Sequence, residues 1–310
     1  MSAVAGPLAL LPSRQSVAAR FLASRFFAVG IIVLGIVVVW YAGAFLLDAP
    51  FQRDLDRRGH VERTFAEFVV ATFNQPKPTL PAPHQVAVDT FDTTLLANPT
   101  KPSSLIFHAW VTLSSTLVGF VSGTLLGILL AVGIVHLRSL DKTLMPWIIS
   151  SQTIPILAIA PMVIVVLAAV GITGLIPKAL ISTYLSFFPV TVGMVKGLRS
   201  PAPIHLDLMR TYYSSRGQVF WKLRLPASLP FLFTSMKVAV AAALVGAIVA
   251  ELPTGAVAGI GAKLLVGSYY SQSIQMWSAL IVGSIMAALL VSVVGIVERF
   301  VTRRMGPRPA

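Results

Sequence analysis

The segment Pro201–Pro230, PAPIHLDLMRTYYSSRGQVFWKLRLPASLP, is polar and basic, and it separates two long hydrophobic blocks of the chain. Apolar residues recur in its first half at every fourth position, at Ile204, Leu208 and Tyr212. This period predicts a short helix with one apolar face. Ser215 followed by Gln218 fits a capping box that opens a second short helix, and Pro226 is expected to end it. The segment therefore predicts two amphipathic helices at a membrane surface.

The charge of this segment permits two interpretations. Its bases, set against the single acid Asp207, are Arg210, Arg216, Lys222 and Arg224. Cytoplasmic loops of membrane proteins are commonly basic, so charge alone indicates an ordinary loop. Two capped amphipathic pieces in one short segment instead favour an element that docks on another protein.

The composition is that of a membrane protein. Of 310 residues, 56% are hydrophobic and only 11% are charged, with a mean hydropathy of +0.83. Soluble domains carry roughly 25% charged residues. The chain has no cysteine, which excludes disulfides, thiolate catalysis and cysteine zinc sites.

Hydrophobic runs long enough to cross a bilayer, about 20 residues each, occur at 26–47, 105–135, 145–170, 175–198, 230–252 and 276–298. With the N-terminus inside, the whole net charge of +13 falls on the cytoplasmic side, as the positive-inside rule expects. Topology thus accounts for the charge without nucleic acid. Both termini are predicted to be cytoplasmic, in a multi-pass protein of the bacterial inner membrane.

This topology divides the chain into parts. They are a cytoplasmic tail at 1–25, a first transmembrane helix at 26–47, an extracytoplasmic insertion at 48–104, a five-helix core at 105–304 with a cytoplasmic coupling loop at 201–229, and a tail at 305–310. The insertion is expected to hold surface helices, including an amphipathic piece from Val61 to Phe73, followed by a proline-rich strap. It is either a contact for a binding protein or a decoration that long loops tolerate at low cost.

The second span carries small residues four apart, at Ser115, Gly119, Gly123, Gly127 and Ala131. Such a stripe lets another helix approach closely in lipid. The partner helix lies either within the same subunit or across a dimer interface.

The third span contains Pro146, Pro155 and Pro161. An interior proline removes one backbone hydrogen bond, and Pro155 is predicted to free the carbonyl of Ser151. Irregular backbone at membrane depth is tolerated only beside protein or a watery cavity. The helix is therefore predicted to line the pathway, with cargo contacted by Ser151, Gln152 and Thr153. Alternatively, these groups only bond to neighbouring helices.

The fifth span is expected to begin with Ser228 as N-cap and Pro230 just inside the helix. Glu251 ends it and is predicted to belong to the translocation pathway, because ionisable groups near hydrocarbon are costly and mark functional sites by default. Alternatively, the Glu251 carboxylate lies at the membrane boundary and is hydrated, with no role in transport. The glycine-rich stretch 255–261 follows no strand, so phosphate binding is disfavoured.

No signature of catalysis is present. The chain lacks G-x-x-x-x-G-K-[ST], G-x-S-x-G and paired carboxylates, and its histidines show no ligand spacing. We therefore predict no catalytic residue, no cofactor, no metal and no enzymatic activity.

The segment 201–230 resembles the EAA loop in permease subunits of binding-protein-dependent ABC importers. That loop opens with Glu-Ala-Ala, has Gly six residues after the Glu, and has the Pro of a Leu-Pro pair nineteen residues after it. Aligned on Leu225–Pro226, the acid is Asp207, the Ala pair falls on Leu208 and Met209, and the Gly falls on Tyr213. The spacing and the acid are kept, but Tyr disfavours the positive φ that Gly permits.

The resemblance, over about residues 105–304, implies an all-α, type I importer permease with six transmembrane helices. Its implied partners are a pair of ABC ATPase subunits, an extracytoplasmic substrate-binding protein, and a second permease copy or sister permease in the lipid bilayer. The ATPase-coupling residues are then Asp207, Leu208, Met209, Arg210, Tyr212, Tyr213 and Arg216. The run from Lys222 to Pro230 suggests the nitrate, sulfonate and taurine branch, which includes pyrimidine and riboflavin-precursor uptake.

Two other classes compete with this interpretation. An ion-gradient-driven secondary transporter usually shows intramembrane ionisable groups and inverted repeats, of which the sequence offers only Glu251 at a boundary. A membrane scaffold protein would not need a third span broken by prolines. ATP hydrolysis is expected on a separate subunit.

Overall fold

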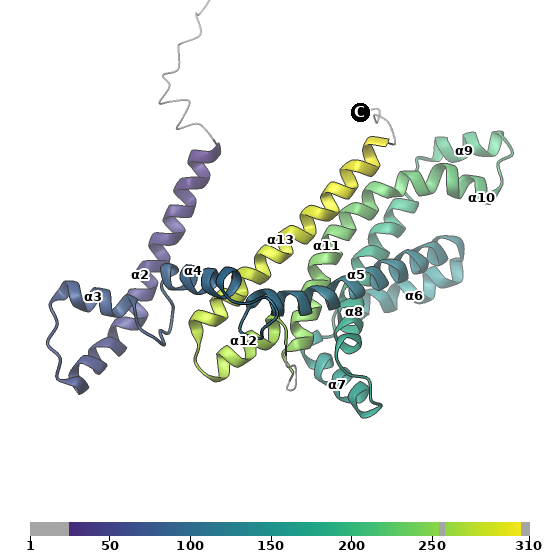
Figure 1. The fold of residues 1–310 in the computed structure, drawn as a ribbon. Helices are drawn as coiled ribbons and strands as arrows, with labels where there is room; N and C mark the ends of the chain where they lie inside the picture. The colour runs from purple at the N-terminus through teal and green to yellow at the C-terminus, as the bar shows by residue number, and fades with distance from the viewer. Residues whose placement is uncertain (1–24, 254–257, 305–310) are drawn as a thin grey trace, which may run out of the picture. The chain divides into compact units, whose positions relative to one another are not determined.

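The computed structural model describes residues 25–253 and 258–304, and all regular elements within these ranges are helical (Figure 1). The predicted cytoplasmic tails lie outside the described residues, apart from Arg25. The chain forms two compact units, divided between Gln85 and Val86, and each is described by itself.

The first unit is built on α2 (Arg25–Gly59), a helix of 35 residues. At about 1.5 Å per residue it is about 52 Å long, more than the roughly 30 Å of bilayer hydrocarbon. The first span was predicted to end at residue 47, but the helix continues through Pro50. Gln75 holds this polar continuation, because its side-chain amide donates to the Asp48 carbonyl (3.1 Å) and to Gln52 Oε1 (3.0 Å).

The second helix of this unit, α3 (Phe65–Phe73), begins with a reciprocal cap. The backbone N–H of Thr64 donates to Glu67 Oε2 (2.9 Å), and this hydrogen bond lowers the pKa of the Glu67 carboxyl. Phe68 packs edge-on against Phe45 of α2, with ring centroids 6.2 Å apart. The predicted amphipathic piece is therefore a helix folded back onto α2. After it, α4 (Pro83–Phe91) contains the boundary between the two units.

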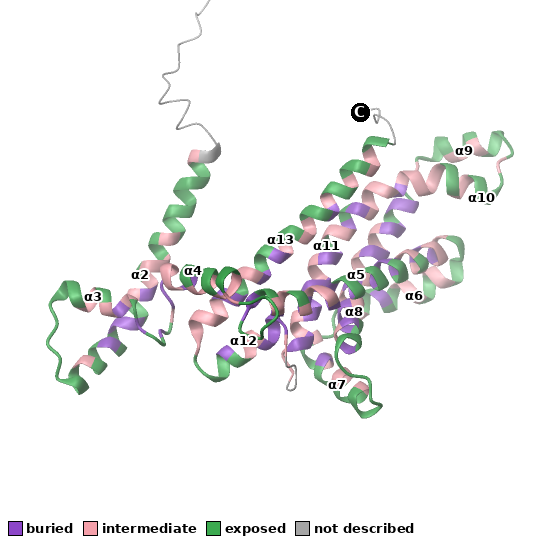
Figure 2. Cartoon of the chain, in the orientation of Figure 1, coloured by how far each residue is buried: buried purple, intermediate pink, exposed green. Residues whose placement is uncertain are grey.

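The second unit is centred on α5 (Leu105–His136), α8 (Leu175–Leu198) and α11 (Leu225–Glu251), where its buried residues concentrate (Figure 2). The small-residue stripe of α5 faces α8: a Cβ added to Gly119 would meet Ser182 Cβ at 2.2 Å, and one added to Gly123 would meet Ser186 Oγ at 2.0 Å. Of the two partners predicted for this stripe, the one within the subunit is confirmed. The short η1 (Asp92–Leu96) precedes α5.

The third predicted span is broken. It consists of α6 (Arg138–Ser151) and α7 (Ile156–Ala169), bent by 98° at the break. Pro155 precedes α7 and cannot donate a backbone hydrogen bond, whereas Pro146 and Pro161 stay inside their helices. Within the described residues, five helices are long and apolar enough to cross a membrane, and the bent pair makes a sixth candidate.

The hairpin between α8 and α11 holds α9 (Pro203–Thr211), α10 (Arg216–Val219) and the π-turn η2 (Phe220–Arg224). The prediction that Pro226 ends the second piece is wrong, since η2 runs directly into α11. Leu225 N–H donates to the Phe220 carbonyl across the wide turn, and Pro226 then falls in the first turn of α11, where no N–H is needed. Ser228 is consequently not an N-cap: its hydroxyl donates to the Leu225 carbonyl (2.8 Å).

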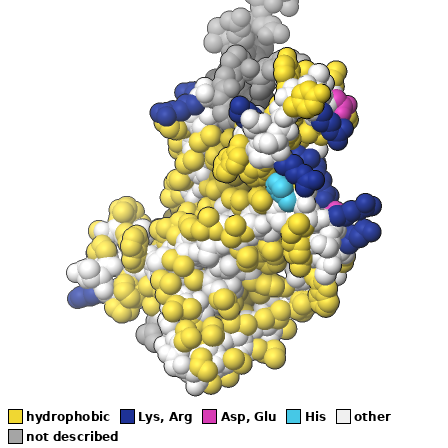
Figure 3. All heavy atoms as spheres, turned by 90° about the vertical axis from the view of Figure 1, so that its right-hand side faces the viewer, with side chains coloured by type: hydrophobic (Ala, Val, Ile, Leu, Met, Phe, Trp, Pro, Cys, Tyr) yellow, Lys and Arg dark blue, Asp and Glu magenta, His cyan; other side chains and the backbone are white. Residues whose placement is uncertain are grey.

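The last two helices are α12 (Ile260–Tyr269) and α13 (Ser273–Arg304). Lys237 of α11 forms an ion pair with Glu298 of α13. Lys and Arg side chains gather around α9 and α10, next to a mostly hydrophobic surface (Figure 3). We call the opposite end of this unit, where α8 begins and α11 ends, the distal end.

Candidate functional site

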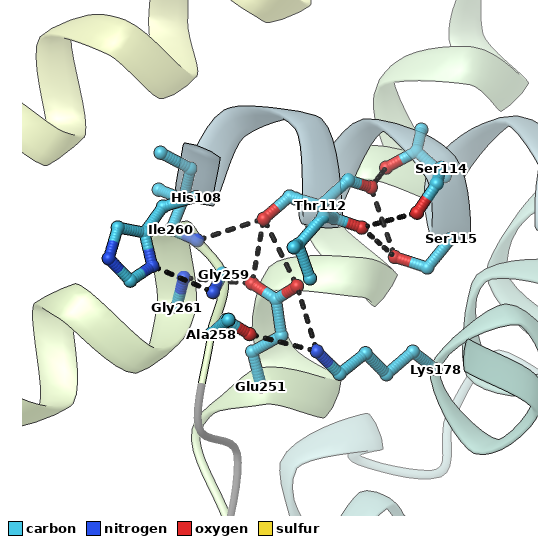
Figure 4. A network of polar contacts seen from close by, with 12 residues as sticks. His108, Thr112, Ser114, Ser115, Lys178, Glu251, Ala258, Gly259, Ile260 and Gly261 are labelled. Atoms are coloured by element: carbon cyan, nitrogen blue, oxygen red, sulfur yellow. Dashed lines mark hydrogen bonds and ion pairs between the residues drawn. The ribbon is translucent and has the colours of Figure 1, made fainter. Parts of the chain in front are cut away.

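A buried carboxylate organises the distal end of the second unit (Figure 4). The side chain of Glu251, at the last position of α11, is 0% exposed. It accepts hydrogen bonds from Thr112 Oγ1 of α5 (2.8 Å to Oε2) and from Gly261 N–H (3.0 Å), and it forms an ion pair with Lys178 Nζ of α8 (3.3 Å). The alternative that Glu251 is hydrated at the boundary is therefore wrong. An unpaired charge in this place would be costly, and the contacts compensate it.

The same side chains cap the N-terminus of α12. The N–H groups of Gly259, Ile260 and Gly261 donate in turn to His108 Nδ1 (3.0 Å), Thr112 Oγ1 (2.8 Å) and Glu251 Oε2 (3.0 Å). The first N–H groups of a helix have no partner within the helix, and a carboxylate also complements the helix dipole. The capping side chains come from α5 and α11, so they fix where α12 starts.

His108 is held in one tautomer by its two neighbours. Its Nε2 lies 2.8 Å from the Pro102 carbonyl, which can only accept, while its Nδ1 accepts from Gly259. The ring is therefore neutral, with the proton on Nε2.

Two glycines are required by this packing. Gly259 has φ of +131°, and a Cβ on it would lie 2.1 Å from the Glu251 carboxyl carbon. A Cβ on Gly261 would lie 2.2 Å from the Ile248 carbonyl oxygen. Gly259 and Gly261 thus allow the backbone to approach the Glu251 side chain and the end of α11 closely.

The break between α6 and α7 is held by α8. Tyr184 Oη donates to the Ser151 carbonyl at 2.5 Å. This is the carbonyl that Pro155 was predicted to free, and the tyrosine hydroxyl replaces the missing backbone donor. The Tyr184 side chain thereby stabilises the irregular backbone between α6 and α7.

Three of the predicted pathway residues, Ser151, Gln152 and Thr153, lie at this break, and they do not form one cluster with the fourth, Glu251. The Ser151 and Thr153 hydroxyls donate to the Ile148 and Ser150 carbonyls at the end of α6 (2.7 and 2.8 Å), and Gln152 is exposed. Hydrogen bonds from α8 reach both places, from Tyr184 to the break and from Lys178 to Glu251.

In the hairpin, α9 ends in a Schellman motif. Tyr213 N–H donates to the Arg210 carbonyl (2.8 Å), and Ser214 N–H donates to the Met209 carbonyl (3.0 Å). Tyr213 has φ of +52°, the left-handed conformation that this position of the motif requires. The predicted capping box follows this motif. The Ser215 N–H donates to Gln218 Oε1 (2.8 Å), and the Gln218 N–H donates to Ser215 Oγ (3.3 Å).

The hairpin presents an uncovered apolar row. Its exposed large side chains are Ile204, Leu208, Tyr212, Tyr213 and Trp221, of which Tyr213 is 98% exposed. Asp207 and Arg210 pair with each other at 3.0 Å on the exposed face of α9, and Arg216 is also exposed. A surface pair of this kind is worth about 0–1 kcal/mol, so it leaves both side chains available to a partner.

Sequence reasoning missed Lys178, Thr112 and His108. Nothing local in the sequence marks Lys178 as the partner of a residue 73 positions away. The glycines at 259 and 261, close after Glu251, were the available signal. Among the described residues, no group of three or more His, Asp and Glu side chains is arranged to hold a metal ion.

These features define a multi-pass helical membrane protein, with an exposed, partly apolar hairpin between two candidate spans and a third span that is broken. A family model described as "Binding-protein-dependent transport system inner membrane component" matches residues 123–307, and the chain belongs to this family. It is thus a transmembrane component of a binding-protein-dependent ABC importer in the inner membrane, and the family is one of transport permeases rather than enzymes.

Curated relatives agree with the family. A "Probable ABC transporter permease protein" of Haemophilus influenzae is 31% identical over 235 residues, which cover 75% of this chain and 91% of that protein. A formylaminopyrimidine transport permease protein of Halalkalibacterium halodurans is 31% identical over 183 residues, covering 59% and 68%. A riboflavin transport system permease protein of Chloroflexus aurantiacus is 29% identical over 196 residues, covering 63% and 71%.

Proposed function

We propose that this permease transmits ATP-driven movement through the hairpin at 201–229, which docks in a groove of a separate ATPase subunit. The observation that carries the proposal is the uncovered apolar row on a hairpin whose turn is capped on both sides. Leu208, Met209, Tyr212 and Tyr213 supply the apolar contact, while Asp207, Arg210 and Arg216 supply charged anchors. A rigid element with a charged rim is suited to carry force between two proteins.

The coupling step is tested with Asp207→Ala and Arg210→Glu, using His205→Ala on the same exposed helix as the matched control. Once desolvated against an ATPase, an anchor that loses its partner costs roughly 3–5 kcal/mol, whereas an exposed pair is worth only about 0–1. We expect both variants to insert normally and to lose substrate-stimulated ATP hydrolysis and uptake together. Full uptake with unchanged ATPase stimulation in the Asp207 variant would remove the hairpin from the mechanism.

We further propose that Ser151, Gln152 and Thr153 contact cargo as it crosses, because they lie at a break in a span and Gln152 is exposed there. Gln152→Leu should lower transport while the ATPase still co-purifies with the permease. Ile149→Leu, an exposed apolar exchange on α6, is the control. Loss of assembly in the Gln152 variant would instead make this residue a packing contact between helices.

The domain organisation and orientation belong to the same proposal. One chain forms half of the pathway, so a second copy or a sister permease completes it, and a binding protein delivers cargo to the side opposite the hairpin. Both termini are placed in the cytoplasm and residues 48–104 outside. A cysteine in place of Phe65, in this chain without cysteines, should react only with reagent added outside. Reaction only from the cytoplasmic side would reverse the orientation.

An ion-gradient mechanism is not favoured. Two pairs of ionisable groups in the described helices neutralise each other, Lys178 with Glu251 and Lys237 with Glu298. With ATP hydrolysis assigned to the separate subunit, the chain itself needs no catalytic residue and no cofactor. The printed names of relatives include formylaminopyrimidine, riboflavin, aliphatic sulfonates, nitrate and bicarbonate. We place the cargo within this range of small solutes.

A further inference from the structure

A cavity of about 580 Å³ opens at the distal end of the second unit, among α5, α7, α8 and α11. Its lining is mostly apolar, with Val111, Ile164, Ala168, Leu175, Ala250 and Pro253 among the wall residues. Volumes of roughly 300–1,000 Å³ suit organic ligands of drug size. The cavity is therefore large enough for a ring compound and much larger than a small inorganic ion.

The polar groups of the cavity are few. Ser114, Ser115 and Thr173 line it together with Lys178, its only charged lining residue. The hydroxyls of Ser114 and Ser115 donate to backbone carbonyls of α5 (2.8 and 3.0 Å), so toward the cavity they offer acceptor lone pairs. Lys178 thus supplies the strong donor of this site.

The Lys178 ammonium has one N–H donor that no acceptor among the described residues uses. Its side chain is 12% exposed, and its ammonium donates to Glu251 Oε1 (3.3 Å) and to the Ala258 carbonyl (3.0 Å). An ammonium carries three N–H donors, and within the described residues two of them have acceptors. The charge of the ammonium is already neutralised by Glu251, so the third donor presents a hydrogen bond rather than an uncompensated positive charge.

We propose that this cavity binds the cargo, and that the cargo is an uncharged or weakly charged ring compound with a carbonyl oxygen or ring nitrogen as acceptor. Its acceptor bonds to Lys178 and its ring lies against the apolar wall. The inference rests on the proposed transport function and names the substrate class. A desolvated inorganic oxyanion needs several charge-assisted donors to replace water. This site offers one ammonium that is already paired, so nitrate and bicarbonate fit it poorly.

The test avoids Lys178, because its removal would leave Glu251 buried without its cation. Ala168 on α7 lines the cavity and its neighbour Ala169 does not, and both are exposed. Ala168→Phe should therefore fill the cavity without overpacking a core, and Ala169→Phe is the matched control. Both are made in the complete importer, with ATPase and binding protein, reconstituted in vesicles.

The probes are riboflavin, a 4-aminopyrimidine and nitrate. With Ser114→Cys as the single cysteine of the permease, we expect a ring probe to slow maleimide labelling at position 114 and nitrate at the same concentration to leave it unchanged. Ala168→Phe should weaken this protection by about tenfold or more, and Ala169→Phe should retain it; tenfold corresponds to about 1.4 kcal/mol. Protection by nitrate alone, protection by no probe, or equal protection in both Phe variants would overturn the assignment.

ATP hydrolysis separates the two proposals. If Ala168→Phe retains the ATPase partner and its basal hydrolysis but loses uptake of the ring probe, both proposals stand. If uptake is the same in both Phe variants, the cavity is a crevice for lipid and only the substrate class fails. If the wild-type complex shows no ATP-dependent uptake of any probe and no coupling to its ATPase, the transport proposal itself fails.

Discussion

Replacing Tyr213 by glycine should stabilise the hairpin and weaken its coupling at the same time. A residue other than glycine in the left-handed region costs roughly 1–2 kcal/mol, and Tyr213 has φ of +52°. Its side chain is 98% exposed, so no packing within the chain offsets this cost. Glycine relieves this strain, but it also loses more backbone entropy on folding than tyrosine does, which costs about 0.5–1 kcal/mol. The hairpin of Tyr213→Gly should thus be more stable by about 0–1.5 kcal/mol.

Coupling should change in the opposite direction. A tyrosine that anchors a protein interface typically contributes about 2 kcal/mol, which corresponds to roughly 30-fold in affinity. We expect Tyr213→Gly to bind the ATPase about that much more weakly and to lose substrate-stimulated hydrolysis. Binding is measured between the solubilised permease and its ATPase, and stability by thermal unfolding of the permease alone.

Two further variants separate the ring from the backbone. Tyr213→Asn tolerates the left-handed conformation but lacks the ring, so it should resemble the glycine variant. Tyr213→Phe keeps the ring and the strain, so it should resemble the wild type in binding. If Tyr213→Gly binds the ATPase as tightly as the wild type and stimulates it fully, the tyrosine is not an interface anchor and the reasoning fails.

Other predictions concern the distal end and the break. Glu251→Gln leaves the Lys178 ammonium without a counter-charge and should lower the free energy of unfolding by about 3–5 kcal/mol. Thermal unfolding of the double variant with Lys178→Met should show part of this stability recovered. A single variant as stable as the wild type would contradict the network. Gly259→Ala should destabilise the protein by a similar amount, since the added Cβ would overlap the Glu251 carboxyl group. If this variant melts at the wild-type temperature, the start of α12 does not need the close contact with Glu251. Tyr184→Phe leaves the Ser151 carbonyl without its hydrogen-bond donor at a cost of about 1–3 kcal/mol, and uptake should slow while ATPase binding stays intact. Undiminished uptake would show that the break does not need this hydrogen bond.

Local rules explain what could be predicted from the sequence. Span positions follow from the lengths of hydrophobic runs, and the cap at Ser215 follows from the preference of the helix N-terminus for a hydroxyl and an amide at fixed spacing. That the Ser151 carbonyl lacks a backbone donor follows from the missing N–H of Pro155. In each case the deciding residues lie within a few positions of one another.

The unpredicted features depend on contacts between distant residues or on a choice between similar backbones. Thr112 and Glu251 are 139 positions apart, so their hydrogen bond leaves no local pattern in the sequence. The continuous helix through Pro226 depends on the π-turn η2, a rare local conformation that the sequence pattern does not indicate. The exposure of Tyr213 could not be predicted either, because it depends on which other elements pack near the turn.

The pairing of Lys178 with Glu251 also constrains how the protein is made. The two residues are separated by 73 positions, and at synthesis rates of about 5–20 residues per second the lysine precedes its partner by roughly 4–15 s. A lone ammonium within hydrocarbon costs about 2.5–3.5 kcal/mol on insertion scales. Lys178 lies in the first turn of α8, so we expect its amine to stay hydrated at the bilayer surface during this interval. We therefore expect α8 to take its final position only after α11, a helix made seconds later, has been inserted.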